Sequence, residues 1–370
     1  MDAGAIRIAV TGDLVLDEPD PDHWLSGIAP ALHSADLAIG HLEVPHTNSV
    51  FEVEGDVPAP GAPIENIAAL ARAGFHMVSL AGNHIADCGA QGIADTTAAL
   101  ESSGILHTGA GLTIADASRP AIASVGRQRI ALLSYNCVGP EFSWASETGA
   151  GCTYLPLGTS DGSPVSPRAD LENVLLPALE ILARDIANAS VTADRVIVAL
   201  HKGIVHTPAK LAPYEREIAQ AAIERGADAV ISHHAHIARG IEFHQGKPIF
   251  HGLGNGCVVT SALSPDQDNE ARKEWVAKRR EMFGFEPDPE YSLAPFHPEA
   301  ANAFIGMITF AAGGPARASI VPVHVEAPGR PVLASGQRAR EIADYVEAIT
   351  LKAGLPAISI GDDGNVELAA

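Results

Sequence analysis

Apolar runs that are typical of buried strands alternate with helical patterns through the first 102 residues. The strand-like runs are short and rich in β-branched residues, and apolar residues at spacings of three and four follow them, which is the helical period. The predicted order is strand 6–10, helix 23–34, strand 37–40, helix 64–73, strand 77–80 and helix 90–102. Strands that alternate with helices predict a sheet covered by helices, and hence an α/β fold.

The rest of the chain continues with hairpins, strands and helices. Gly126-Arg127-Gln128 and Gln245-Gly246 each separate two short apolar runs, which predicts two hairpins. A helix is expected over 171–189, with a kink at Pro177. The other predicted elements are a loop over 136–170, strands 195–200, 227–231, 303–310 and 319–325, and helices 214–224, 269–282 and 337–353. Because no repeat or flexible linker divides it, the chain is expected to form a single domain over 1–370, with a long insertion at about 258–302.

Polar side chains of a particular kind stand at the ends of five predicted strands. They are Asp13, Glu43, Asn83, His201 and the pair His234 and His236. In an open α/β sheet, ligands bind beyond the carboxyl ends of the strands. Carboxylates, an amide oxygen and imidazoles make a mixed set of oxygen and nitrogen ligands. Such a set predicts a site for one or two divalent metal ions, with Mn, Fe, Zn, Mg and Ca all open.

Composition narrows the classes of partner. The 45 acidic and 24 basic residues give a formal net charge of −21, which would repel nucleic acid and anionic membranes. The four cysteines form no CxxC pair, and no apolar run reaches the roughly 20 residues that span a bilayer. The N-terminus lacks the basic and long apolar regions of a signal peptide. We therefore expect a soluble, cytoplasmic protein with no nucleic-acid or membrane partner.

Several short motifs together resemble one known family. The motifs are Thr11-Gly12-Asp13, Leu42-Glu43, Gly82-Asn83-His84 with Asp87, Leu200-His201-Lys202-Gly203, His234-Ala235-His236 with Gly240-Ile241-Glu242, and Leu253-Gly254-Asn255. The chain resembles the CapA family of capsule proteins, within the calcineurin-like metallophosphoesterase superfamily, over roughly residues 5–256. The resemblance implies a four-layer α/β/β/α sandwich of two mixed sheets flanked by helices. It also implies that the six residues at the strand ends hold the metal.

The chain departs from the superfamily pattern at three of these positions. Typical phosphoesterases carry a histidine two residues after the first aspartate, where this chain has Val15. Glu43 stands in place of a bridging aspartate. Lys202 follows the fourth-motif histidine, where the family often has tryptophan, and we expect it to hold an anionic group of the substrate. Arg239 is a second candidate for substrate binding.

The candidate catalytic residues are histidines with neighbouring carboxylates. His84 can transfer protons near neutral pH, and Asp87, three residues on, can orient its ring. His297 lies between two prolines in Pro295-Phe296-His297-Pro298, which limits its backbone freedom. It could serve as a second acid or base, near an acidic residue such as Asp13. His46 and His251 stay undecided between a supporting role and none.

Three functions compete for this set of residues. The favoured one is epimerisation at the Cα of a peptide residue, as in the lasso-peptide epimerases among CapA-like proteins, because inversion needs an acid and a base on opposite faces. The alternative is metal-dependent hydrolysis of a phosphoester or amide, of the poly-γ-glutamate type. The third is a non-catalytic binder of an acidic polymer, which the net charge disfavours. The expected substrate is a peptide or a small anion, and the oligomeric state stays open.

Overall fold

The computed structural model describes residues 5–53, 60–264, 270–311 and 314–369. Its helices are α1 (Pro21–Leu25), α2 (Ala29–His33), α3 (Ile67–Ala73), α4 (Gly89–Ser102), α5 (Ile114–Ala117), α6 (Leu176–Thr192), α7 (Pro213–Glu224), α8 (Glu270–Phe283) and α9 (Gly336–Lys352). Four short 3₁₀ segments are also formed within the described residues, namely η1 (Ile64–Asn66), η2 (Glu141–Ser143), η3 (Ser261–Leu263) and η4 (Pro298–Ala301).

The larger of the two main sheets has 10 strands in the described residues and mixes parallel with antiparallel pairs. Its main path runs β19-β20-β17-β16-β1-β2-β3-β4, while β15 pairs with β1 and β18 with β17. The strands are β1 (Ile6–Leu16), β2 (Leu37–Leu42), β3 (Met77–Ser79), β4 (Leu106–Thr108), β15 (Asn255–Val259), β16 (Asn302–Phe310), β17 (Ala316–Glu326), β18 (Arg330–Leu333), β19 (Ile358–Ile360) and β20 (Asn365–Leu368). The run β1-β2-β3-β4 is parallel, so its carboxyl ends share one edge.

The second sheet runs β13-β14-β12-β11-β7-β6 and is parallel at its centre. Its strands are β6 (Ala121–Val125), β7 (Gln128–Asn136), β11 (Arg195–His201), β12 (Ala229–His233), β13 (Ile241–His244) and β14 (Lys247–Phe250). Two small two-stranded sheets pair β5 (Ala110–Gly111) with β8 (Gly151–Cys152) and β9 (Leu157–Thr159) with β10 (Leu171–Val174). Both predicted hairpins are confirmed as β6–β7 and β13–β14.

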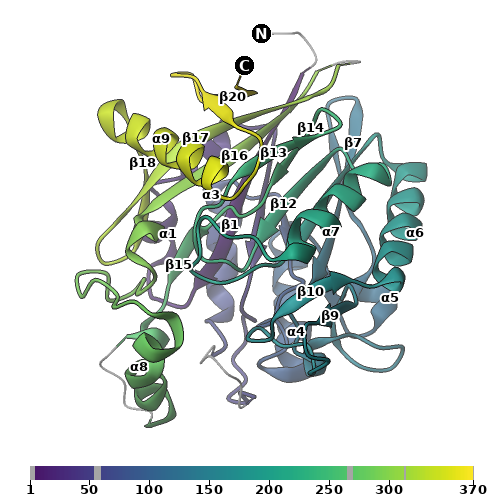
Figure 1. The fold of residues 1–370 in the computed structure, drawn as a ribbon. Coiled ribbons are helices and arrows are strands. Elements are labelled where there is room, and N and C mark those ends of the chain that lie inside the picture. Colours follow the sequence, from purple (N-terminus) through teal and green to yellow (C-terminus); the bar gives the residue numbers. More distant parts are fainter. Residues whose placement is uncertain (1–4, 54–59, 265–269, 312–313, 370) are drawn as a thin grey trace.

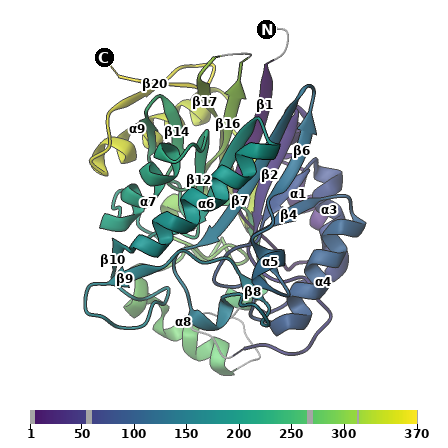
Figure 2. The same ribbon diagram turned by 90° about the vertical axis from the view of Figure 1, so that its right-hand side faces the viewer.

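The core is divided into layers by these two sheets. One buried cluster contains side chains of both, such as Ile8 of β1 and Ile197 of β11, and therefore lies between the sheets. A second buried cluster lies between the outer face of the larger sheet and helices α1 to α4. A third lies between the outer face of the second sheet and helices α6 and α7. Figure 2 shows α6 and α7 in front of β7 and β12, with α3 and α4 beside β2 and β4. The predicted α/β/β/α sandwich is confirmed.

Prolines changed two of the predicted elements. The helix predicted over 23–34 is two short helices, because Pro30 begins a new one in α2. The helix predicted from 171 begins only at Leu176. Pro177 lies in its first turn, where it causes no kink, and residues 171–174 form β10 instead.

The carboxyl ends of β1, β2, β3, β11 and β12 lead to one region of the molecule. Figure 1 shows β1 descending from the N-terminus at the top, with α8 at the lower end, beyond the strands. Between β15 and β16 the chain forms η3, α8 and η4, in the stretch predicted as an insertion. Asp13 lies inside β1 rather than after it, because the strand continues to Leu16 beyond a register shift at Asp13. No helix in the described parts of the chain is long and apolar enough to cross a membrane.

Candidate metal centre and catalytic dyad

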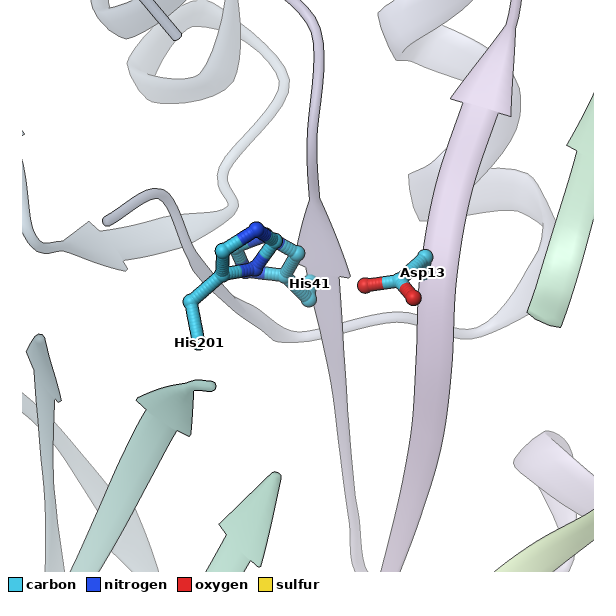
Figure 3. Close-up of side chains that lie close together, drawn as sticks. All are labelled: Asp13, His41 and His201. Carbon is cyan, nitrogen blue, oxygen red and sulfur yellow. The ribbon is translucent and has the colours of Figure 1, made fainter. Parts of the chain in front are cut away.

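Polar side chains from both sheets converge where these strands end. We call the following residues the open cluster: Asp13 of β1, His41 and Glu43 at the end of β2, His201 of β11, and His234 and His236 after β12. Figure 3 shows Asp13 facing the rings of His41 and His201, which lie against each other. Five of these side chains are almost fully buried, and the His236 side chain is 15% exposed. Residues far apart in the chain are thus packed into one polar site.

The contacts within the cluster bring ligand-type atoms close to one another. The His201 Nε2 atom lies 2.7 Å from Asn83 Oδ1 and 3.1 Å from His234 Nδ1. Both carboxylate oxygens of Asp13 accept hydrogen bonds from the His234 backbone N–H. Asn83, which follows β3, therefore meets the cluster through His201.

Many polar atoms of the cluster have no hydrogen-bond partner in the described structure although they are buried. They are both carboxylate oxygens of Glu43, Nε2 of His41, Nδ1 of His201 and Nε2 of His234. Buried polar atoms of this kind are costly unless something satisfies them. A cation would do so, since carboxylate oxygens and neutral imidazoles are metal ligands. The residues fit a divalent metal ion.

Two groups of three residues could each hold a metal ion. Within each group, the ligand atoms lie within 4.8 Å of one another. One is Asp13, His41 and His201, and the other is Asp13, Glu43 and His236. The two groups share Asp13. The arrangement can therefore hold one ion, or two ions with Asp13 between them.

Burial and mutual charge set the protonation of the cluster. Burial lowers the pKa of His234 to about 3, and burial with the neighbouring His41 holds the pKa of His201 well below its usual value. These rings are neutral at pH 7 and keep a lone pair for a ligand. His236 differs: burial alone would lower its pKa, but the Glu43 carboxylate 3.3 Å away raises it to about 9. In the metal-free protein, a His236 cation thus pairs with Glu43.

His84 and Asp87 form a buried pair beside the open cluster. The Nδ1 atom of His84 lies 2.7 Å from the Asp87 carboxylate. The His84 side chain is 11% exposed and lines two cavities, both of which also contain His236 and Phe296. An imidazole whose ring is oriented by a carboxylate and which faces a cavity can act as an acid or base.

His297 lies in a neighbouring cavity and not in those of His84. Its cavity is lined by Asn255, Val258 and Phe296, and the last two also line one of the His84 cavities. The His297 Nδ1 atom accepts a hydrogen bond from the Glu299 backbone N–H at 3.1 Å. No hydrogen bond or ion pair of the described residues joins His297 to Asp13, so the structure does not bring these two residues together as a pair.

The structure places Lys202 and Arg239, which were predicted to bind substrate, in a buried ion-pair network. Both side chains are fully buried and pair with the same carboxylate oxygen of Glu215, at 3.0 and 2.6 Å respectively. Arg239 also donates to the backbone carbonyls of Ile204, Thr207 and Lys210, and so holds the loop after β11. Neither cation is accessible to a substrate.

Two histidines near the cluster were absent from the predicted site. His41 precedes Glu43 by two residues, and the alternation of side chains along a strand was the signal that places both on one side. His206 lines a cavity together with His84 and His236, and it adopts φ +56°. Its ring packs edge-on against Phe283 and Phe285. Nothing in the local sequence marks His206, because long-range packing brings these rings together.

The two undecided histidines lie apart from the open cluster. His251 is buried and pairs with Glu242 at 3.0 Å, on the side of Lys202. His46 is buried, and its Nδ1 atom lies 3.3 Å from the Val44 carbonyl oxygen. Neither belongs to the two groups of potential metal ligands.

Comparison with known proteins adds sequence relatives. The chain is 35% identical over 199 residues to a probable polyglutamine synthesis accessory protein of Mycobacterium tuberculosis, which covers 52% of this chain and 47% of the relative. It is 27% identical over 237 residues to the capsule biosynthesis protein CapA of Bacillus anthracis, covering 63% of this chain and 53% of that protein. The matches span about half the length of these relatives.

A similar solved structure is a calcineurin-like phosphoesterase of Bacillus subtilis, at 11% identity and a TM-score of 0.38, with 94% of this chain and 97% of that chain covered. The profile of one protein family, described as bacterial capsule synthesis protein PGA_cap, matches residues 4–258. That match covers more than two thirds of the chain and contains every residue of the open cluster and the His84–Asp87 pair. The chain therefore belongs to the PGA_cap family of bacterial capsule synthesis proteins, which confirms the resemblance to CapA.

Proposed function

We propose that this chain is a metal-dependent enzyme in which His84 transfers protons beside the open cluster. The observation that carries the proposal is the buried His84–Asp87 pair, 2.7 Å apart, at cavities shared with His236. With its Nδ1–H donated to the carboxylate, a neutral His84 has its lone pair on Nε2, and the side chain lines both cavities. That arrangement supports a base of fixed orientation.

A divalent ion, when bound, would polarise a carbonyl or phosphoryl oxygen of the substrate. The residues that would hold it are Asp13, Glu43, Asn83, His201, His234 and His236. The unpartnered buried atoms of Glu43, His201 and His234 support this assignment. The chain's own part in the reaction is then to hold the substrate beside His84 and to move protons.

For the reaction itself we propose epimerisation at the Cα of a peptide residue. The hydrogen bonds of the two candidate histidines make them complementary. His84 presents a lone pair at Nε2, whereas His297 accepts at Nδ1 from Glu299 and, as a neutral ring, carries its proton on Nε2. One histidine is thus set up as a base and the other as an acid, and their cavities share Phe296.

The proton balance of this reaction is simple. His84 removes the proton from Cα, and the electron pair of that bond moves into the adjacent carbonyl. His297 then delivers its proton to Cα from the other face, and solvent restores both rings. Mass does not change and no oxidant or reductant is needed. A peptide is also compatible with the net charge of −21, which would repel a polyanion.

Hydrolysis of an amide or phosphoester is the second candidate. It is favoured by the separation of His297 from Asp13, because a hydrolytic mechanism needs only His84 and the metal-ligand set. The Mycobacterium relative is named for polyglutamine synthesis, and a polyglutamine chain offers amide bonds. The two reactions differ in mass balance: hydrolysis adds water, and epimerisation in D₂O exchanges one hydrogen for deuterium.

A panel of short peptides, incubated with the purified chain in D₂O, separates the two reactions. We expect a mass increase of one deuterium at Cα together with a D-residue on chiral analysis. His84→Gln should abolish both, and His297→Asn should stop inversion while exchange through His84 persists. Cleavage of the peptides, of poly-γ-glutamate or of p-nitrophenyl phosphate without Cα exchange would establish hydrolysis instead. Full activity of His84→Gln would overturn the proposed role of the dyad for either reaction.

A further inference from the structure

His41 occupies a central position in the open cluster. It lies on β2, its exposure is zero, and its ring centroid is 4.6 Å from those of both His201 and His233. Figure 3 shows its ring lying against His201 and opposite the carboxylate of Asp13. The imidazole is therefore inside the site and not at its margin.

The hydrogen bonds of His41 determine which ring nitrogen has a lone pair. Its Nδ1 atom lies 2.9 Å from Ser79 Oγ, and the Ser79 hydroxyl in turn donates to the Gly40 carbonyl at 3.4 Å. Since the hydroxyl hydrogen is directed to Gly40, Ser79 accepts the Nδ1–H of His41. The Nε2 atom then carries the lone pair, and it has no hydrogen-bond partner among the described residues although it is buried. Histidines that bind metals are oriented in the same way, by donating the other ring N–H to a fixed acceptor.

Gly82 approaches this nitrogen closely. A Cβ atom added to Gly82 would lie 3.1 Å from His41 Nε2 and 3.3 Å from His201 Cε1. Both contacts would be tighter than is usual for a Cβ atom, so a side chain at this position would crowd both rings. Gly82 directly precedes Asn83, whose side-chain oxygen contacts His201.

The residue two positions after Asp13 on β1 is apolar. Val15 lines the cavity that also contains Glu43 and His236, and it offers no ligand there. An imidazole, that of His41, stands instead on the neighbouring strand β2, where one of its ring nitrogens and the ligand atoms of Asp13 and His201 lie within 4.8 Å of one another. Val15 of β1 therefore supplies no nitrogen ligand, whereas His41 of β2 can supply one.

We propose that His41 is a metal ligand of this protein, and that it binds a divalent ion through Nε2 together with Asp13 and His201. Two imidazoles and one carboxylate favour Zn²⁺, Fe²⁺ or Co²⁺ over Mg²⁺ and Ca²⁺, which prefer oxygen ligands. Asp13 also belongs to the group with Glu43 and His236, so this carboxylate joins the two groups. The proposal rests on the metal dependence of the proposed function, but not on which reaction the chain catalyses.

The test is binding of Co²⁺ to the metal-free full chain. Calorimetry measures the stoichiometry and affinity, and the visible spectrum of the ion reports its ligands. His41→Asn keeps a side-chain N–H for Ser79 and removes the Nε2 ligand. We expect it to lose one equivalent of Co²⁺, or to bind it at least about tenfold more weakly, with a changed spectrum. The matched control is His46→Asn, which alters another buried histidine whose Nε2 has no hydrogen-bond partner in the described residues. It should bind Co²⁺ as the unmodified chain does.

A second variant keeps the test valid if His41→Asn does not fold. Gly82→Ala places a methyl group beside His41 Nε2, and it should weaken Co²⁺ binding in the same direction. In competition, Zn²⁺ should displace Co²⁺ and excess Mg²⁺ should not. Unchanged stoichiometry, affinity and spectrum in a folded His41→Asn protein would overturn the role of His41 and leave the proposed function standing. A chain that binds no Co²⁺ at all would overturn both.

Discussion

Two buried polar clusters meet at the end of β11, and they have opposite characters. His201 belongs to the open cluster, in which several buried oxygen and nitrogen atoms have no hydrogen-bond partner in the described residues. Its neighbour Lys202 belongs to what we call the paired cluster, which consists of Lys202, Glu215, Arg239, Glu242 and His251. Every one of these five side chains contacts a partner of complementary charge or hydrogen bonding. Adjacent residues on one strand thus enter two different environments.

The difference indicates what each cluster is for. A paired set of buried charges holds a structure together but leaves nothing for a ligand, because its donors and acceptors are used. Here it fixes the loop after β11, through the three carbonyls that Arg239 binds. A set of unpartnered ligand atoms tolerates its burial cost only if a ligand or ion completes it. Charge alone would have suggested Lys202 and Arg239 as binding residues, whereas satisfaction of hydrogen bonds separates structure from function.

The largest expected effect is on turnover, and it comes from the His84–Asp87 pair beside the open cluster. His84→Gln should lower the rate by about 10²–10⁴-fold, since a positioned acid or base contributes that much. Asp87→Asn should lower it less, because it leaves the ring in place and removes only the carboxylate that orients it. The measurement is the rate of deuterium uptake or of cleavage. His46→Asn serves as the control with unchanged activity, and a His84→Gln rate within a few-fold of the original would contradict the assignment.

The next largest effect is on stability, and we expect it from substitutions in the paired cluster. Glu215→Gln leaves the buried Lys202 and Arg239 without their shared carboxylate, which should cost about 3–5 kcal/mol of unfolding free energy. Glu43→Gln should cost less in the metal-free protein, because Glu43 pairs with a single cation, His236, whose side chain is 15% exposed and can lose its proton. Denaturant unfolding in the presence of a chelator measures both. Equal losses for the two variants would contradict the distinction between the clusters.

Metal binding should stabilise the protein through the open cluster alone. At a concentration of ion 100 times its dissociation constant, the unfolding free energy should rise by about 2.7 kcal/mol. Glu43→Gln should reduce this gain. Gln220→Ala, which removes a hydrogen bond to Glu242 at the edge of the paired cluster, should leave it intact. Thermal unfolding with and without Zn²⁺ checks the prediction, and a gain that both variants reduce alike would speak against a specific site.

The smallest expected effect is a pH dependence of the metal-free protein. Burial alone would lower the pKa of His236, but Glu43 raises it to about 9 in the folded chain, against about 6.5 in the unfolded chain. The charged His236 therefore contributes its full stabilisation below pH 6.5, and this stabilisation is lost as the pH rises through 9. The pKa of Glu43 is lowered to about 2 by His236, so its contribution is present above about 4.5 and is lost as pH falls toward 2. Between pH 6.5 and 9.5 we expect a loss on the order of 1–3 kcal/mol. Chemical unfolding in chelator should show this loss in the original chain and a smaller one in His236→Asn.

The local sequence was sufficient for most of the layered fold. Periodic apolar positions marked the main strands and helices, and polar residues at strand ends marked the metal-ligand set. Errors arose where proline was misread, as at Pro30 and Pro177, each of which lies in the first turn of a helix. The short strands β18, β19 and β20 were missed, because so few residues carry no clear period.

What the amino-acid sequence determined is the inventory of the site and the side of each strand on which a residue can lie. Alternation along a strand already separates His201 from Lys202 and joins His41 with Glu43. Only the tertiary structure decided which residues from distant parts of the chain contact the side chains on each side of a strand. Glu215 of α7 lies close enough to bind Lys202 and Arg239, and the chain after α8 brings Phe296 against the rings of His236 and His206. Local pattern cannot specify such pairings, because the free energy that selects them comes from burying residues that are distant in the chain.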